Sequence, residues 1–341
     1  MDGYALKGVE ADLHAQFKVV GEAAAGHRWT GTLGAGQAIR IFTGAPVPNG
    51  ADKVVIQEDV TRSGDLITIS DDPGPKFIIR PAGVDFAVGM VLGAPRRRSA
   101  CDVALLAAMN IAEVPVRRRP VVALISTGDE LVLPGEAPGR DQIIASNTFG
   151  LAAMLEQLGA VSRILPIARD TDTSLRTVLG LTEGADLIVT IGGASVGDHD
   201  LVAGVAADLG MEQAFYKVAM RPGKPLMAGR LSSVPMVGLP GNPVSAMVCG
   251  TVFLTPMLNA MLGLEQAETP RVSLPLSAPL AANGPREHYM RAIVEDGQVR
   301  DAGLQDSSLL SVLARANALI VRPPHDDARS VGAWVDAIPL G

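Results

Sequence analysis

The sequence contains very little cysteine, since only Cys101 and Cys249 occur among its 341 residues and they form no Cys-x-x-Cys pair. A disulfide framework or a structural zinc site is therefore not expected. The start of the chain also lacks a signal peptide, because Asp2 and Lys7 interrupt any apolar run. These features favour a protein of the reducing cytoplasm.

Aromatic residues are scarce, at 4% of the chain, and the formal net charge is −7 with a pI near 5.3. Few aromatic rings leave few platforms for stacking bases, and a negative protein repels phosphates. We therefore expect no nucleic-acid partner. The arginine triplets at 96–98 and 117–119 are interpreted as solvated linkers.

One uncharged run has the length of a membrane span, namely the nineteen residues Ala246–Leu264. It contains Gly250 and Pro256 and begins just after a helix start at Pro243. We interpret it as a buried, kinked core helix and expect no association with a membrane.

Two nucleotide-binding motifs are missing: no G-x-G-x-x-G follows a strand, and no G-x-x-x-x-G-K-[ST] occurs. Dinucleotide binding and P-loop chemistry therefore lack support. The chain is 48% hydrophobic and 19% charged, which is typical of a globular protein. Its length allows two or three domains.

The hydrophobic pattern predicts a multi-domain α/β protein. Strands and helices alternate in the middle of the chain, which indicates a mostly parallel sheet with helices on both faces. Short strands dominate on either side, with a hairpin signal at Asp296-Gly297. We expect a β-rich domain, a helical connecting segment, a central α/β domain and a small β-barrel at 1–85, 86–119, 120–267 and 268–341.

The central domain is organised around residues 186–200. Leu187–Ile191 is a short apolar run rich in β-branched residues, typical of a strand buried on both faces. Gly192 and Gly193 then allow a tight turn and the close approach of a ligand. Two carboxylates and a helix follow, an order with which α/β proteins bind anions and metals.

Acidic residues follow three strands of the predicted sheet: Glu130 the first, Asp170 the second, and Asp198 and Asp200 the third. The carboxyl ends of parallel strands lie on one edge of a sheet, so we expect these residues to converge. A single acid in such a place is usually a helix cap. A group of carboxylates repels itself and indicates a divalent cation, for which we favour Mg²⁺.

Two further stretches offer positive charge or free N–H groups. Lys217, Arg221 and Lys224 lie within eight residues; they form either a basic surface loop or, beside the acidic edge, an oxyanion site, which we favour. Residues 238–245 combine a strand end, a rigid turn and a helix start at Pro243. The free N–H groups of such a helix start favour binding of an anion; the alternative is a well-capped helix without a ligand.

Gly193–Gly197 matches the G-x-S-x-G nucleophile elbow, with Ser195 as the nucleophile. A serine hydrolase would also need a histidine, and His288 or His325 is available downstream. Both histidines fall in the predicted C-terminal β domain, outside the sheet that would carry Ser195. We therefore favour a ligand-binding loop over a hydrolase.

Taken together, seven stretches resemble the molybdopterin molybdenumtransferase family, the molybdate insertases that include the gephyrin E domain. A single such motif is modest evidence, whereas seven in the right order are specific. They cover nearly the whole chain: 1–5, 41–58, 80–85, 126–131, 192–200, 221–225 and 238–245.

The resemblance implies a homodimer with its site at the dimer interface. Residues 1–85 would be a lid domain, 86–119 the remnant of a dimerisation domain, 120–267 the molybdopterin-binding domain and 268–341 the C-terminal barrel. The reaction would take adenylylated molybdopterin and molybdate, release AMP and leave molybdenum on the dithiolene, with Mg²⁺. Molybdopterin adenylyltransferase and cofactor-accepting molybdoenzymes would be partners.

The resemblance and the residues together give a set of expected site residues. The catalytic positions are Asp2, Thr43, Asp85, Glu130, Asp170 and Asp200. The substrate-binding positions are Gly192, Gly193, Ser195, Lys217, Arg221, Lys224, Pro240, Pro243 and Ser245. The metal ligands are Glu130, Asp170, Asp198 and Asp200.

Two departures from the family pattern stand out. The family usually has Lys where this chain has Arg221, which keeps the charge but changes the hydrogen-bond geometry. The family also carries a further segment before the motif at Met1, so we expect the natural protein to be longer there. A second hypothesis is a catalytically impaired relative that holds molybdopterin as a scaffold, and a hydrolase using Ser195 is a more distant one.

Overall fold

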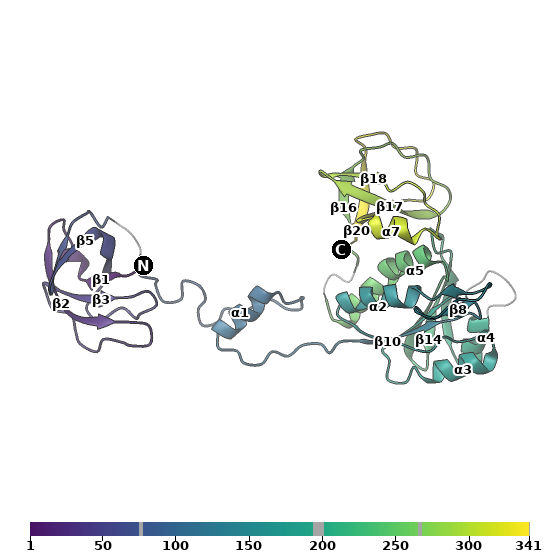
Figure 1. The fold of residues 1–341 in the computed structure, drawn as a ribbon, viewed down its shortest axis with the longest axis horizontal. Coiled ribbons are helices and arrows are strands. Elements are labelled where there is room, and N and C mark those ends of the chain that lie inside the picture. The colour runs from purple at the N-terminus through teal and green to yellow at the C-terminus, as the bar shows by residue number, and fades with distance from the viewer. Residues whose placement is uncertain (75–77, 194–200, 265–267, 341) are drawn as a thin grey trace. The chain divides into compact units, whose positions relative to one another are not determined.

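A computed structural model describes residues 1–74, 78–193, 201–264 and 268–340. The chain divides into two units, Met1–Leu92 and Gly93–Gly341, which we describe one at a time (Figure 1). Each unit has its own clusters of buried apolar side chains.

The first unit is a six-stranded sheet with the order β4-β1-β3-β2-β6-β5. Neighbouring strands are antiparallel except β2 and β3. Alternate residues of one strand, such as Ile67 and Ile69, are fully buried, as the two-residue period of a half-buried strand requires. The predicted β-rich N-terminal part is confirmed. Its elements are β1 (Gly3–Leu6), η1 (Gly8–Glu10), β2 (Gln16–Ala23), β3 (Gln37–Ile41), β4 (Lys53–Ile56), η2 (Gln57–Asp59), β5 (Val60–Ser63) and β6 (Leu66–Ile69).

Helix α1 (Ala100–Ala108) opens the second unit and begins with a capping box. The Asp102 N–H donates to Ser99 Oγ at 3.1 Å, and the Ser99 N–H donates to the Asp102 carboxylate at 2.8 Å. These two bonds satisfy backbone groups that the helix leaves unpaired, and they fix its start.

Arg97, Arg118 and Arg119 are exposed, as expected for solvated linkers, but their guanidinium groups also contact the α/β domain. Arg97 donates to the carbonyls of Gln157 and Leu158, and Arg119 donates to those of the next two residues. These carbonyls lie at and just after the end of helix α2 (Asn147–Gln157), where the last carbonyls of a helix lack intrahelical donors. Arg118 pairs with Asp186 at 2.5 Å. The triplets therefore tie the connecting segment to the α/β domain.

The central sheet has the order β10-β7-β11-β15-β14-β12. Its first four strands are parallel, namely β10 (Val161–Ile164), β7 (Val121–Ser126), β11 (Leu187–Ile191) and β15 (Val234–Leu239). Helices α2 (Asn147–Gln157) and α5 (Pro243–Cys249) cover one face, and α3 (Asp172–Gly180) and α4 (Leu201–Asp208) cover the other (Figure 1). This confirms the predicted architecture.

Strand β11 shows why an uninterrupted apolar run forms the centre of this sheet. Leu187, Val189 and Ile191 join the core on the side of α2 and α5, whereas Ile188 joins the core formed with α3 and α4. Both faces of the strand are buried, so neither face selects polar residues.

The sequence pattern does not predict strand β14 (Pro225–Leu231), which forms an antiparallel hairpin with β15 and pairs with β12 (Glu212–Lys217) on its other side. The hairpin turn contains Ser232 and Ser233, whose φ angles are 48° and 70°. Serine is uncommon in this left-handed region, so the turn carries none of the usual Asn-Gly or Gly-Gly signal.

The long apolar helix continues from α5 through a π-helical segment (Gly250–Leu254) into α6 (Thr255–Met261). Among the described residues, Pro243–Met261 is long and apolar enough to cross a membrane, with a mean hydropathy of 1.5, but half of the window is buried inside the protein. Leu254 and Leu258 are fully buried in the core that also contains β11. A Cβ at Gly250 would lie 2.7 Å from Leu151 of α2. The arrangement is that of an interrupted core helix.

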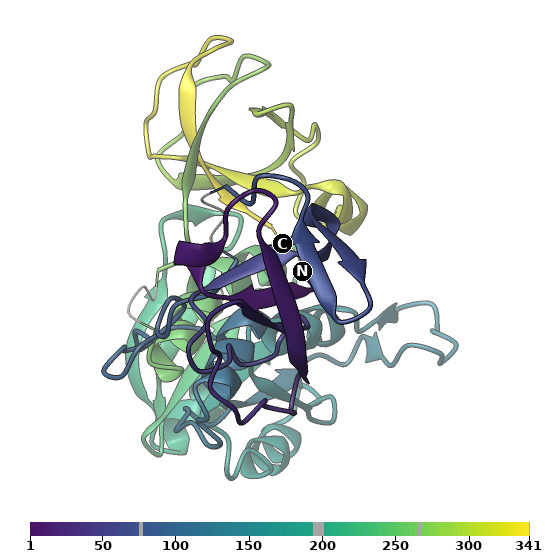
Figure 2. The same cartoon turned by 90° about the vertical axis from the view of Figure 1, so that its left-hand side faces the viewer.

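The C-terminal strands form a sheet with the order β13-β17-β19-β20-β16, and β18 pairs with β17. A bridge between Leu276 and Val299 connects the chain next to β16 with β18, which closes the sheet into a barrel. The predicted hairpin at Asp296-Gly297 is confirmed, with φ angles of 49° and 74°. Strand β13 arises within the α/β domain and joins the two regions by pairing with β17. The strands near the C-terminus are drawn in yellow at the top of Figure 2. The elements are β13 (Met220–Arg221), β16 (Val272–Pro275), β17 (Glu287–Glu295), β18 (Gln298–Asp301), α7 (Leu310–Arg315), β19 (Ala318–Arg322) and β20 (Trp334–Pro339).

Candidate functional site

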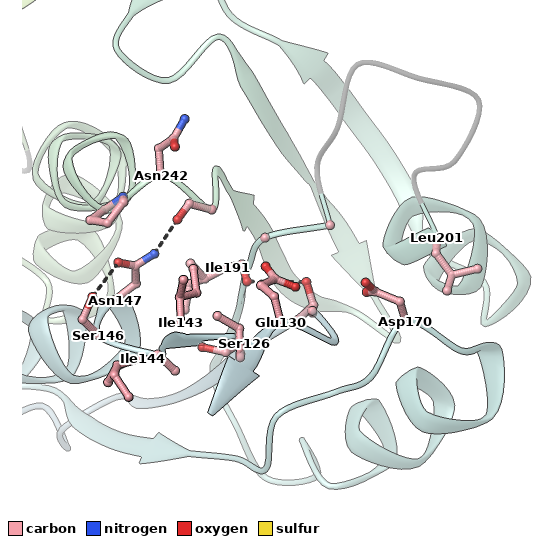
Figure 3. A pocket seen from close by; sticks show the side chains of 18 of the residues that line it. Ser126, Glu130, Ile143, Ile144, Ser146, Asn147, Asp170, Ile191, Leu201 and Asn242 are labelled. Atoms are coloured by element: carbon pink, nitrogen blue, oxygen red, sulfur yellow. Dashed lines mark hydrogen bonds between the residues drawn. The ribbon is translucent and has the colours of Figure 1, made fainter. Parts of the chain in front are cut away.

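A cavity of about 1260 Å³ opens at the carboxyl ends of β7, β11 and β15 (Figure 3). Ligands bind at this edge in open α/β sheets because the loops that follow parallel strands meet there. The walls come from two short strands, β8 (Leu131–Val132) and β9 (Ile143–Ile144), and from the starts of α2 and α5. Polar side chains from several segments face the cavity, including Ser126, Glu130, Asn147, Asp170 and Asn242.

Glu130 and Asp170 lie in the same cavity although 40 residues separate them. Glu130 belongs to the loop after β7, and Asp170 belongs to the loop after β10. In Figure 3 the Glu130 side chain lies beside Ser126, and the Asp170 side chain lies between Glu130 and Leu201. The other two predicted metal ligands, Asp198 and Asp200, and the predicted substrate contact Ser195 lie outside the described residues.

The donor chemistry of this pair fits a magnesium ion. Among the described residues no group of three or more Asp, Glu, His or Cys side chains could hold a metal. Mg²⁺, however, is commonly held by one or two carboxylates and completes its shell with water and substrate phosphates. Glu130 and Asp170 could therefore hold the ion together with a phosphate-bearing substrate.

Glycine is required at both described positions of the glycine loop. Gly192 has a φ of 96°, and a Cβ there would lie 2.7 Å from the Thr127 carbonyl oxygen; Gly193 has a φ of 68°, and its Cβ would lie 2.4 Å from Val202. The Gly192 N–H already donates to the Leu239 carbonyl at 3.1 Å. Gly192 thus contributes close packing at the floor of the cavity and offers no free N–H to a ligand.

The start of helix α5 also offers fewer donors than the sequence suggests. Pro243 lines the cavity but has no N–H, and the Val244 N–H donates to the Ser307 carbonyl at 3.1 Å. Pro240 and Ser245 are buried and do not line the cavity.

Asn147 is a cavity residue at the start of helix α2. Its Nδ2 donates to the Gly241 carbonyl at 2.7 Å, which joins the start of α2 to the turn before α5 (Figure 3). Nothing in the local pattern around Asn147 indicates this contact, because its partner is 94 residues away.

Lys217, Arg221 and Lys224 are exposed and do not line the cavity. They nevertheless belong to the same edge of the sheet. Strand β12 runs in the direction of the parallel strands because two antiparallel pairings separate it from β15. Lys217 therefore lies at a carboxyl end, three strand spacings from β11, which corresponds to about 14 Å.

The cationic loop, residues 217–225, is anchored by apolar contacts. Met220 is 2% exposed and belongs to the same core as β11. A Cβ at Gly223, whose φ is 103°, would lie 2.3 Å from the Cys249 sulfur of α5. The Val218 N–H donates to the Lys224 carbonyl at 3.2 Å, which closes the loop. The backbone is held while the three cations point outward.

The C-terminal barrel adds positive charge beside this loop. Arg286 donates to the Met220 carbonyl at 3.5 Å, and His288 is the strand neighbour of Arg221. Burial and then the charge of Arg221 lower the pKa of His288 to about 4, with smaller effects from three more arginines of the barrel. The sequence gives no signal for this cluster, because it depends on the pairing of β13 with β17.

In the first unit, the structure brings Asp2 and Thr43 together. The Asp2 carboxylate accepts from the Thr43 N–H at 2.9 Å and from the Thr43 hydroxyl at 3.1 Å. These hydrogen bonds lower the pKa of Asp2. Asp85 lies in the same unit and is exposed.

Three family models match consecutive parts of this chain. The MoeA N-terminal region (domain I and II) matches residues 1–110, a probable molybdopterin binding domain matches 123–260, and the MoeA C-terminal region (domain IV) matches 273–340. All residues that line the cavity lie within the second match, except Ser308 in the third.

Whole-chain comparisons agree. The chain is 36% identical to a molybdopterin molybdenumtransferase of a Nostoc species, over all of this chain and 82% of that protein. It is 34% identical to a protein of the same name from Haemophilus influenzae, over all of this chain and 86% of that protein. The crystal structure of a molybdopterin biosynthesis MoeA protein from Pyrococcus horikoshii matches with a TM-score of 0.80 at 29% identity, covering 99% of this chain and 86% of that one.

Proposed function

Because this chain belongs to the molybdopterin molybdenumtransferase family, enzymes of molybdenum cofactor biosynthesis, we propose that adenylylated molybdopterin and molybdate react at the described cavity with release of AMP. One observation carries the assignment: Glu130 and Asp170 reach a single cavity from two different strand ends. Two carboxylates alone would repel an anionic substrate. They suit a substrate whose phosphates arrive with a cation.

In this proposal each group has a separate task. Glu130 and Asp170 hold Mg²⁺, with Asp198 and Asp200 as further ligands. The bound ion supplies positive charge against the pyrophosphate as its bond breaks. Lys217, Arg221 and Lys224, together with Arg286, neutralise molybdate. An elongated substrate with its pyrophosphate in the cavity and its dithiolene toward the cationic loop would contact both regions.

The proposed function is tested by following AMP release from adenylylated molybdopterin in the presence of molybdate and Mg²⁺. The Glu130→Gln variant should lose at least about 100-fold in rate, because the transition state loses several kcal/mol of charge stabilisation. Glu136→Gln is the matched control, since the Glu136 carboxylate accepts from the nearby Leu133 N–H and does not line the cavity.

The same assay separates the enzyme from a scaffold that binds molybdopterin without turnover. Failure of the wild-type protein to release AMP would leave the scaffold as the better hypothesis. The relatives are named as transferases, which gives no support to a hydrolase. Its candidate histidines, His288 in β17 and His325 after β19, belong to the C-terminal barrel.

We also propose that the protein is a cytoplasmic homodimer. Helix α1 buries only Asp102, and the segment around it exposes apolar side chains, with Val103 at 60% and Val116 at 76%. Burial against a second copy of the chain is the proposed reason for this exposure. Cys101 and Cys249 are free, as in a reducing compartment. Molybdopterin adenylyltransferase is the proposed supplier of substrate, and molybdoenzymes are the recipients.

Sedimentation of the wild-type protein and of a Val103→Asp, Val116→Asp double variant tests the dimer. The wild type should sediment as a dimer and the variant as a monomer. A monomeric wild type at micromolar concentration would contradict this proposal.

A further inference from the structure

Arg169 is placed to join the two loops that carry Glu130 and Asp170. One of its guanidinium nitrogens, Nη1, lies 3.3 Å from the Gly128 carbonyl oxygen, 3.1 Å from that of Asp129 and 3.0 Å from that of Leu131. Three carbonyls therefore converge on a side chain that immediately precedes Asp170. Two of these carbonyls belong to Asp129 and Leu131, the residues on either side of Glu130.

A second contact runs in the opposite direction. The Asp170 N–H donates to the Asp129 carboxylate at 3.2 Å. The backbones also pair, since the Gly128 N–H donates to the Ala168 carbonyl at 3.1 Å. The residue before Glu130 thus holds the backbone of Asp170, and the residue before Asp170 holds the backbone around Glu130.

We propose that Arg169 is a positioning residue that fixes Glu130 relative to Asp170 and thereby sets the affinity of the metal site. The proposal rests on the metal site of the proposed function. Arg169 itself points its guanidinium at backbone carbonyls and is not among the residues that line the cavity. Its role is to preorganise ligands, as residues that support metal ligands commonly do.

The charge of Arg169 and its role in positioning the loops predict opposite changes in metal affinity when Arg169 is replaced. Removing a positive charge close to a cation site should strengthen metal binding if the guanidinium acted only through its field. Releasing the loops should weaken binding, because the two carboxylates would no longer be held for one ion. Lysine keeps the charge but lacks the planar fork, so Arg169→Lys should also weaken binding if position matters.

The test measures binding of Mn²⁺ alone to the full chain by the loss of its free EPR signal. Arg169→Met and Arg169→Lys should raise the Mn²⁺ dissociation constant by about 10- to 100-fold. Arg163→Met is the matched control, because Arg163 also donates to a backbone carbonyl of the same domain, that of Glu183 at 2.9 Å, without lining the cavity. It should bind Mn²⁺ like the wild type.

A second readout separates positioning from a general loss of structure. The Mg²⁺ concentration for half-maximal AMP release should rise in Arg169→Lys, while the rate at saturating Mg²⁺ should return to within a few-fold of wild type. Unchanged or tighter Mn²⁺ binding in either Arg169 variant overturns the proposal. So does a wild-type protein that binds no Mn²⁺.

The outcomes also distinguish this inference from the proposed function. Mn²⁺ binding is measured without molybdopterin, so a wild type that binds Mn²⁺ but releases no AMP contradicts the function alone. If Arg169→Met fails to fold, Asp129→Ala takes its place, because it removes the acceptor of the Asp170 N–H. It should weaken Mn²⁺ binding in the same direction, and unchanged binding would overturn the proposal.

Discussion

The acidic loops at 128–131 and 168–171 and the cationic loop at 217–225 lie at the same edge of one sheet, but different interactions hold them there. The acidic loops are tied by hydrogen bonds of Arg169 and Asp129. The cationic loop is anchored by the buried Met220 and by contact of Gly223 with Cys249. Directional bonds suit ligands that must meet one ion, whereas packing suits charges that must face outward.

The largest effect should come from breaking the apolar anchor. Met220→Ala removes a side chain that is 2% exposed in the core of the α/β domain, and should lower the free energy of unfolding by about 2–4 kcal/mol. Denaturant unfolding measures the loss, and the KM for molybdate should rise as the loop loosens. Met90→Ala, at a position 45% exposed, is the control. A loss no greater than that of the control would show that packing does not hold the loop.

The arginines around His288, beside the same loop, predict that the free energy of unfolding depends on pH. His288 has its pKa lowered to about 4 from an unfolded value of 6.5, so between these values the unfolded chain binds more protons than the folded one. Stability should therefore rise as pH increases from about 4 to 6.5 and be independent of this group above that window, with a total gain of at most about 3 kcal/mol.

His288→Gln should flatten that part of the stability profile, while replacement of the exposed His14 by Gln should leave it unchanged. Inorganic phosphate or molybdate bound beside the arginines should raise the pKa of His288 and reduce the slope. An identical slope in wild type and His288→Gln would contradict the assignment.

In the acidic loops, a substitution at Gly128 should change the position of a carboxylate, and hence the activity, more than the free energy of unfolding. Gly128 has a φ of 142°, and a Cβ there would lie 2.3 Å from a carboxylate oxygen of Glu130. Gly128→Ala should displace that carboxylate and reduce the rate of AMP release at least about tenfold. Backbone strain should lower the free energy of unfolding by only about 1–2 kcal/mol. Gly135→Ala carries similar strain, with a φ of 94° but nothing within 4 Å of the added Cβ. Equal activity of the two variants would contradict the role of Glu130.

The sequence predicts the parts of this site that follow from local pattern. Leu187–Ile191 forms the expected central strand, and the acids at strand ends allow the convergence of Glu130 and Asp170 to be foreseen. Both inferences depend on one rule, that carboxyl ends of parallel strands share an edge. The family resemblance is confirmed by whole-chain relatives.

What the sequence does not predict are contacts between distant segments. Arg169 reaches carbonyls about 40 residues away, and Asn147 reaches Gly241 across 94 residues. The acceptors are backbone carbonyls in both cases, so no side-chain pattern indicates these contacts. Strand β14 is missed for a related reason, since its turn uses two serines in a conformation that glycine or asparagine normally adopts.

The smallest effect should come from Thr190, between the glycine loop and the core. Its side chain is 1% exposed, and its hydroxyl has no hydrogen-bond partner in the part of the chain that the structure describes. A buried unpaired hydroxyl costs free energy, so Thr190→Val should raise the free energy of unfolding by up to about 1 kcal/mol. Thr148→Val is the control, because the Thr148 hydroxyl accepts from Ser126 at 3.5 Å and should not gain. AMP release should stay unchanged in Thr190→Val. A loss of stability there would show that the hydroxyl is paired in solution, and a loss of activity would place it in the substrate site.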